Sequence, residues 1–372
     1  MMRQIPIQDL QWRHTAFLSM QPVDRPLLGI WVGDYYFTSQ FPHGVSRWQP
    51  GAEITPQELT FEQFLPDYRN LYELHERLND DFFYVGSAYP GLPWMEAIMG
   101  CRVNAEESST WTTPFLSDYA QLEELRPVGE SPWFRKLIEL TSALVEWADG
   151  RFPVNAPLLR GPADIAAAMR GSTQFVMDFY DNPEGVKQLL DLCAQARKQV
   201  MQAILDIVKP FHSGLAAGGY PSKLWTPGKT CLYNQEDAAA VLSPRIFERF
   251  LLPLEDSIAT QADLAYIHLH SSCLYPVDIL LRDSNYSVLQ VNYDHDGSGP
   301  RLPAILPTLK KILEQRPLIL WGEFTLDEMK QLATLGSRGL SLQPIVANEQ
   351  EARACQDAVL RIWQSAGSQV KD

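Results

Sequence analysis

Short apolar runs alternate along this chain with longer stretches in which apolar residues recur every three or four positions. Apolar runs bounded by small or polar residues are typical of buried strands, and the three- and four-residue spacing is typical of amphipathic helices. The predicted helices include 131–148, 182–208, 243–262, 306–315 and 326–336. The predicted strands are 25–33, 80–89, 152–161, 213–221, 264–270, 286–294, 317–324 and 338–345.

This alternation predicts parallel strands joined by helical crossovers. About eight such units predict an α/β fold, a (β/α)8 TIM barrel, as a single domain over residues 1–372. An open doubly wound sheet is the alternative, but no Gly-x-Gly-x-x-Gly follows the first strand and no Walker A segment occurs. Residues 34–80 and 88–130 are long, aromatic-rich and irregular in pattern. We expect them to be insertions after the first two strands that form a lid over the carboxyl-terminal end of the barrel, where barrel enzymes keep their active sites.

Charge and cysteine content narrow the functional classes. A net charge of −14 and a pI of about 5.0 argue against nucleic acid and anionic membrane surfaces as partners. The cysteines are scattered and contain no Cys-x-x-Cys, which argues against a disulfide framework. Because no apolar run has the length of a membrane span and the N-terminus lacks a secretory apolar region, we expect a cytoplasmic protein.

The segment LAYIHLH, residues 264–270, carries the candidate chemistry. Alternate residues of a strand point to the same side, so His268 and His270 should face the mouth of the barrel while Leu269 packs outward. Asp294 and Glu323 end the next two predicted strands and should lie on the same rim. These four polar residues are a candidate site for zinc or another divalent metal. The alternative is a metal-free pair of histidines that bind substrate or act as general acid and base.

Aromatic residues crowd the two insertions. Most should form the packed lid, and the rest should line a pocket for a flat or amphipathic ligand. We select Trp31, Tyr35 and Tyr89 as candidate substrate-binding residues. Arg160 lies at the end of the third predicted strand and could anchor a carboxylate or phosphate group of the substrate.

Three segments together resemble the uroporphyrinogen decarboxylase superfamily. They are PWMEAIMGCRV (93–103), LLRGPADIAAAMRGSTQFVMDFYDNPEGVKQLLDLC (158–193) and LSPRIFERFLLPLEDSI (242–258). The superfamily consists of (β/α)8 barrels and includes tetrapyrrole decarboxylases and zinc-dependent methyltransferases that use corrinoids or thiols. The resemblance implies pocket residues just before the third segment, at Tyr233, Asn234 and Asp237. Asp237 thereby joins the two histidines as a catalytic candidate, with a helix cap as its alternative role.

Departures from the superfamily pattern refine this expectation. The tetrapyrrole decarboxylases have an arginine-rich loop after the first strand and an aspartate at the end of the second, whereas residues 30–44 contain no arginine and the second strand ends in Val85–Tyr89. We therefore expect no decarboxylation of uroporphyrinogen. The methyltransferases hold zinc with His-x-Cys and a cysteine on the last strand, where this chain has His-x-His and Gln343.

The resemblance implies methyl transfer between a small-molecule substrate and a corrinoid or thiol carrier, assisted by a divalent metal at the histidines. The sequence has no Asp-x-His-x-x-Gly segment, so any corrinoid should be carried by a separate partner protein. One alternative is a decarboxylase or carbon–carbon lyase acting on a small or tetrapyrrole carboxylated substrate. Another is a non-catalytic barrel that binds a small molecule. The sequence leaves a homodimer open.

Overall fold

The computed structural model describes residues 5–33, 36–216, 223–228, 230–294 and 299–369. Its central element is a parallel sheet whose strands lie in the order β1, β12, β11, β10, β9 and β8, with β2 also paired to β12. The bounds are β1 (Leu27–Leu28), β2 (Trp31–Val32), β8 (Cys231–Gln235), β9 (Leu264–His270), β10 (Val288–Tyr293), β11 (Leu318–Gly322) and β12 (Leu340–Val346).

Isolated backbone hydrogen bonds continue the ring between β1 and β8. Asp81 N donates to Leu28 O over 2.9 Å, and Asn155 N donates to Gly86 O over 3.0 Å. Gly161 N then donates to Gln235 O, at the end of β8, over 2.7 Å. The segments near residues 81–86 and 153–161 thus occupy the second and third strand positions without forming continuous ladders, and the fold is the predicted α/β barrel.

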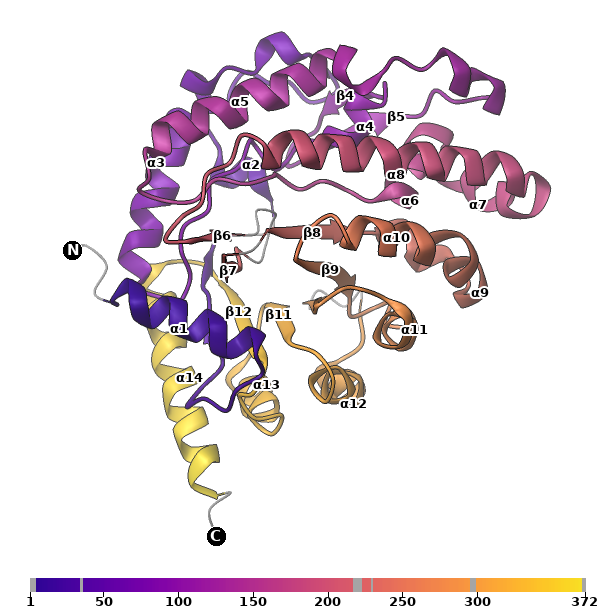
Figure 1. Cartoon of the computed structure of the whole chain (residues 1–372). Coiled ribbons are helices and arrows are strands. Elements are labelled where there is room, and N and C mark those ends of the chain that lie inside the picture. The colour runs from indigo at the N-terminus through magenta and orange to yellow at the C-terminus, as the bar shows by residue number, and fades with distance from the viewer. Residues whose placement is uncertain (1–4, 34–35, 217–222, 229, 295–298, 370–372) are drawn as a thin grey trace.

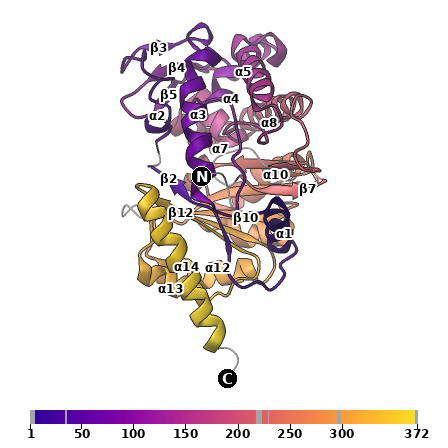
Figure 2. The same cartoon turned by 90° about the vertical axis from the view of Figure 1, so that its left-hand side faces the viewer.

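Helices surround this ring of strands, as Figures 1 and 2 show. Several begin at a proline, which suits the first helical position because its missing N–H would have no partner there. Asn182 caps the longest of them by accepting a hydrogen bond from Gly185 N over 3.1 Å. None of the helices in the described part of the chain combines the length and apolar character that a membrane span requires. Their bounds are α5 (Pro132–Ala148), α6 (Pro162–Arg170), α7 (Ser172–Asp181), α8 (Pro183–Leu205), α9 (Pro244–Ile246), α10 (Leu252–Ala259), α11 (Pro276–Asp283), α12 (Leu302–Leu313), α13 (Leu326–Ala333) and α14 (Glu349–Gln369).

Helix α1 (Ile7–Leu18) covers the amino-terminal end of the barrel, where Phe17 packs with Leu27 and Phe82. Beside it lies an antiparallel hairpin of β6 (Gly214–Ala216) and β7 (Trp225–Pro227). The prediction of a sheet strand at 213–221 was therefore wrong for its described residues, because β6 pairs only with β7. The parallel position belongs to β8, which was not among the predicted strands because its sequence CLYNQ contains two amides, both buried in the structure.

The two insertions contain more regular structure than their sequence suggested. Residues 61–78 form helix α3 (Phe61–Leu78), so the expectation of an irregular segment was wrong there; Pro66 inside the helix obscures its pattern. Glu96 bonds Arg160 after the third strand position, and Thr38 bonds Ser108, which brings the insertions together near these strand ends. A lid over the histidines within one domain stays a prediction. The other elements are α2 (Phe37–Gln40), α4 (Trp94–Ile98) and the antiparallel β3 (Glu53–Ile54), β4 (Arg102–Ala105) and β5 (Thr110–Thr113).

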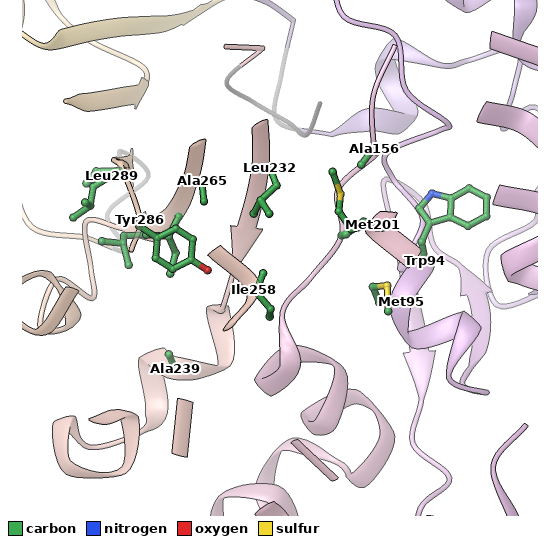
Figure 3. Packing of buried hydrophobic residues seen from close by; sticks show 14 of the residues in the cluster. Trp94, Met95, Ala156, Met201, Leu232, Ala239, Ile258, Ala265, Tyr286 and Leu289 are labelled. Atoms are coloured by element: carbon green, nitrogen blue, oxygen red, sulfur yellow. The ribbon is translucent and has the colours of Figure 1, made fainter. Parts of the chain in front are cut away.

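Alternation along the strands decides which side chains face the barrel interior. Leu232, Ala265 and Leu289 come from three adjacent strands and belong to the cluster that also contains Ile258 of α10 (Figure 3). The residues next to these three in sequence point the opposite way, into the barrel, and pack with interior residues of other strands. Tyr266 is one of them. His268 and His270 share the parity of Tyr266, so β9 directs both imidazoles inward.

Candidate active site

The two histidines end β9 with their side chains in contact. His268 Nε2 and His270 Nε2 lie 3.2 Å apart, and the ring planes meet at 87°. Only 5% of His268 is exposed, whereas 35% of the His270 side chain is exposed. Leu269, between them, points away from the barrel interior and is buried in the hydrophobic cluster that the strands share with the helices. One imidazole is therefore part of the barrel interior and the other lies at its surface.

The second nitrogen of each imidazole is bonded to an oxygen of β10 or of the residue that follows it. His268 Nδ1 donates to Oε1 of Gln290, which is its direct neighbour in the register of β9 and β10. His270 Nδ1 donates to Asp294 Oδ1 over 2.7 Å. Hydrogen bonds of this kind fix the tautomer and orientation of an imidazole. The two Nε2 atoms are consequently the ones available for chemistry.

Asp294 is held by several donors besides His270. Its Oδ1 accepts from Asn292 Nδ2 over 2.8 Å. Its Oδ2 accepts from the backbone N of Ser272 over 3.0 Å and from the Ser272 and Ser271 hydroxyls. The sequence suggested Asp294 as a metal ligand. The structure places its carboxylate behind His270, where it orients the imidazole.

Asp237 approaches the histidines from the end of the neighbouring strand. It begins the short 3₁₀ helix Asp237–Val241 directly after β8, and its Oδ1 lies 3.5 Å from His270 Nε2. Asp237, His268 and His270 each offer one ligand atom, and these atoms all lie within 4.8 Å of one another. The N–H groups that start the 3₁₀ helix are bonded by Asp164, so Asp237 does not cap its own helix. Its Oδ2 accepts a hydrogen bond from Gln235 Nε2, which leaves Oδ1 directed at His270.

The pKa values of the two imidazoles are shifted in opposite directions. Burial and the charge of His270 lower the pKa of His268 to about 4. Burial also opposes the charged form of His270, but hydrogen bonds to Asp237 and Asp294 outweigh it and raise its pKa to about 10. Burial raises the pKa of Asp294, but its hydrogen bond with His270 and the charge of that ring have the larger combined effect and lower it to about 2. Without a bound cation, His270 is the protonated member of the pair at neutral pH and His268 the neutral one.

Other predicted site residues lie around this group or away from it. Tyr233 is close to it, with its ring centroid 6.1 Å from that of His268. Asn234 lies on the outer face of β8, where its amide donates to Glu255 over 2.7 Å, so alternation turns it away from the histidines. Glu323 is exposed and lies outside the group of three potential ligands found among the described residues.

The remaining candidates for substrate binding have different environments. The Arg160 guanidinium donates to Glu96 over 2.9 Å, and 40% of its side chain is exposed. Trp31 faces the interior against Trp321 and lines a separate cavity. Tyr89 is fully buried among other aromatic rings of the insertions. Tyr35 lies outside the described residues.

Sequence reasoning missed the polar partners on β10. Gln290 and Asn292 stand at alternate positions of VLQVNY, a strand that is otherwise apolar or aromatic. Both face the histidines, Gln290 through Oε1 and Asn292 through a 3.3 Å contact with His270 Nδ1. Their period-two spacing matches that of the two histidines and was the available signal.

Comparisons with known proteins agree with this architecture. Residues 91–207 match the family model described as "Uroporphyrinogen decarboxylase (URO-D)", which confirms the resemblance to that superfamily over this segment. A methyltransferase from Methanosarcina mazei has the same fold, with 15% sequence identity, a TM-score of 0.60 and coverage of 95% of this chain and 99% of its own. A B12-independent methionine synthase from Shewanella sp. W3-18-1 aligns at 10% identity over 93% of this chain and 97% of its own, with a TM-score of 0.47 that is too low to argue from. A search among curated proteins gave no match.

Proposed function

We propose that this chain is a metal-dependent enzyme of the uroporphyrinogen decarboxylase superfamily that transfers a methyl group between a small substrate and a corrinoid or thiol carrier. The observation that carries the proposal is the convergence of His268 Nε2, His270 Nε2 and an Asp237 oxygen within 4.8 Å. The family match over 91–207 and the fold shared with a methyltransferase support the choice of reaction. A corrinoid carrier would be a separate protein, and the active protein would be cytoplasmic.

The donor set fits a divalent cation such as zinc. Two imidazole nitrogens and one carboxylate oxygen are a ligand set of catalytic zinc sites, which leave one position open for water or substrate. The Nδ1 atoms already donate to Gln290 and Asp294, so the Nε2 lone pairs of neutral imidazoles face the shared space. A cation held by Asp237, His268 and His270 would supply Lewis acidity to a substrate thiol, hydroxyl or carbonyl oxygen.

The chain's own residues would position the reactants. Asp294 and Gln290 hold the imidazoles in place through their Nδ1 protons, and the 3₁₀ helix fixes Asp237. Arg160 bonds Glu96 through only one of its guanidinium nitrogens, so the remaining N–H groups suit an anionic group of the substrate. Tyr233 borders His268 on the interior side and would limit the depth to which a substrate enters.

A second function is favoured by the separated pKa values of the histidines. A neutral His268 beside a protonated His270 is the arrangement of a general base next to a general acid. Without metal, such a pair would serve decarboxylation or carbon–carbon lysis of a small carboxylated substrate. A barrel that only binds its ligand would need neither metal nor proton transfer.

The metal content of protein purified without chelator tests the first function. We expect about one divalent ion per chain in the wild type, and loss of that ion in Asp237→Asn but not in the exposed control Asp327→Asn. Methyl transfer from methylcobalamin to a thiol should depend on the same ion. Metal-free protein that still releases CO₂ from a small carboxylated substrate would support the lyase instead, and metal-free protein without either activity would support the binding barrel.

A further inference from the structure

A second cavity lies away from the histidines, between β2, residues 84–90 and helix α3. It has about 740 Å³ of empty space when the solvent at its open side is counted, and about 80 Å³ in which the centre of a water molecule fits. Its wall is mainly apolar and aromatic and includes Trp31, Leu71, Leu74 and Tyr84. It shares no lining residue with the pocket that contains His268 and His270.

One ammonium group faces this cavity. Lys223 Nζ lies 5.3 Å from the centroid of the Trp31 ring and 5.8 Å from that of Tyr84. Within the described part of the chain, Lys223 has no hydrogen-bond or ion-pair partner. Burial lowers the pKa of Lys223, and the charge of Asp80 opposes this only in part. The aromatic faces stabilise the cation but do not replace an anion.

Two of the other polar residues that line the cavity, His75 and Tyr68, have hydrogen-bond partners. His75 Nε2 is bonded to Phe82 O at 3.0 Å. Tyr68 donates its hydroxyl to Ser87 O over 2.9 Å. What the cavity offers a charged ligand is therefore an extended apolar wall with a single half-buried cationic group, whose charge an anion beside it would compensate.

We propose that this cavity binds an amphipathic monocarboxylate, with its apolar body against Trp31, Leu71 and Leu74 and its carboxylate paired with Lys223. The mainly apolar wall and the single cation suit an arylalkanoate or a medium-chain alkanoate. The inference does not depend on the chemistry at the histidines, because its site and theirs have no residue in common.

Binding of 4-phenylbutyrate and of the uncharged 4-phenylbutyramide, measured by calorimetry, tests the inference. The wild type should bind the carboxylate roughly 10-fold to 100-fold more tightly than the amide, the factor that one charged hydrogen bond supplies. Lys223→Met should remove this preference, while Lys209→Met, at an exposed lysine, should keep it. Leu74→Trp, which fills part of the cavity, should weaken the binding of both compounds.

Two results would overturn the inference. The first is a wild type that binds neither compound, or binds both equally. The second is an unchanged preference for the carboxylate in folded Lys223→Met. If Lys223→Met does not fold, Leu74→Trp decides, because undiminished binding of the carboxylate by that variant would place its site elsewhere.

Discussion

Replacing His268 with alanine should destabilise the protein as well as inactivate it. Position at the mouth of a barrel suggests that either histidine can be removed at little cost in stability, and the structure supports this only for His270. His268 is 5% exposed, and Gln290, whose Oε1 accepts its Nδ1 proton, is 0% exposed. Gln290 Nε2 has no partner among the described residues, so the mutation would leave the whole amide without one.

The Gln290 amide that is left without a partner determines how much stability His268→Ala should lose. A buried polar group without a partner costs roughly 1–3 kcal/mol, and the space left by the imidazole adds to this. His270 is more exposed, and its partner Asp294 keeps bonds from Asn292 and the serines, so His270→Ala should cost less than His268→Ala. Urea unfolding of the wild type and both variants measures the difference.

A double variant isolates the cause. Replacing Gln290 with methionine in the His268→Ala protein removes the stranded amide and keeps a similar volume, so part of the lost stability should return. The reasoning is refuted if His268→Ala is as stable as His270→Ala. It is also refuted if the double variant His268→Ala/Gln290→Met is no more stable than His268→Ala alone.

Three further outcomes are expected. Asp294→Asn should weaken zinc binding about 10- to 100-fold in a chelator competition, because the carboxylate orients His270, whereas Asp327→Asn should leave it unchanged; equal effects would contradict this. Asp178→Asn should lower the free energy of unfolding near neutral pH. Burial raises the pKa of Asp178, but hydrogen bonds, first that of Arg170, lower it below 3.8. The loss of stability in the variant, measured by urea titration, should therefore shrink as pH falls below that value. Asn182→Ala should cost roughly 0.5–2 kcal/mol by thermal unfolding through loss of the α8 cap, and an unchanged stability would contradict the role of Asn182.

Elements with an unambiguous period were predictable from the sequence. Strand 264–270 and helix 182–208 correspond to β9 and α8, because seven apolar-rich residues and an Asn-Pro start specify them locally. The prediction of a sheet strand at 213–221 was wrong because small apolar residues suit a hairpin as well as a central sheet. Which of the two forms depends on the strand that is available as a partner. Here β8 took that position through its pairing with β9.

The site was predictable only where one strand supplied it. Period two placed His268 and His270 together, but Asp237 came from the family resemblance, and Gln290 was not predicted. Gln290 meets His268 because β9 and β10 pair in parallel with these residues in register. Register between parallel strands depends on the packing of the crossover helix, which leaves no local mark in the sequence.

The polar residues of the three strands form one continuous patch inside the barrel. Gln235, His268 and Gln290 occupy neighbouring interior positions, since register pairs Gln235 with His268 and His268 with Gln290. Such a patch is expensive in a barrel core, and Gln290 Nε2 and Asn292 Oδ1 have no partners among the described residues. A sequence selected for stability alone would place branched apolar residues there. The cost is explained if these amides serve to hold two imidazoles at fixed angles beside Asp237, which makes the patch itself an argument that the histidines are functional.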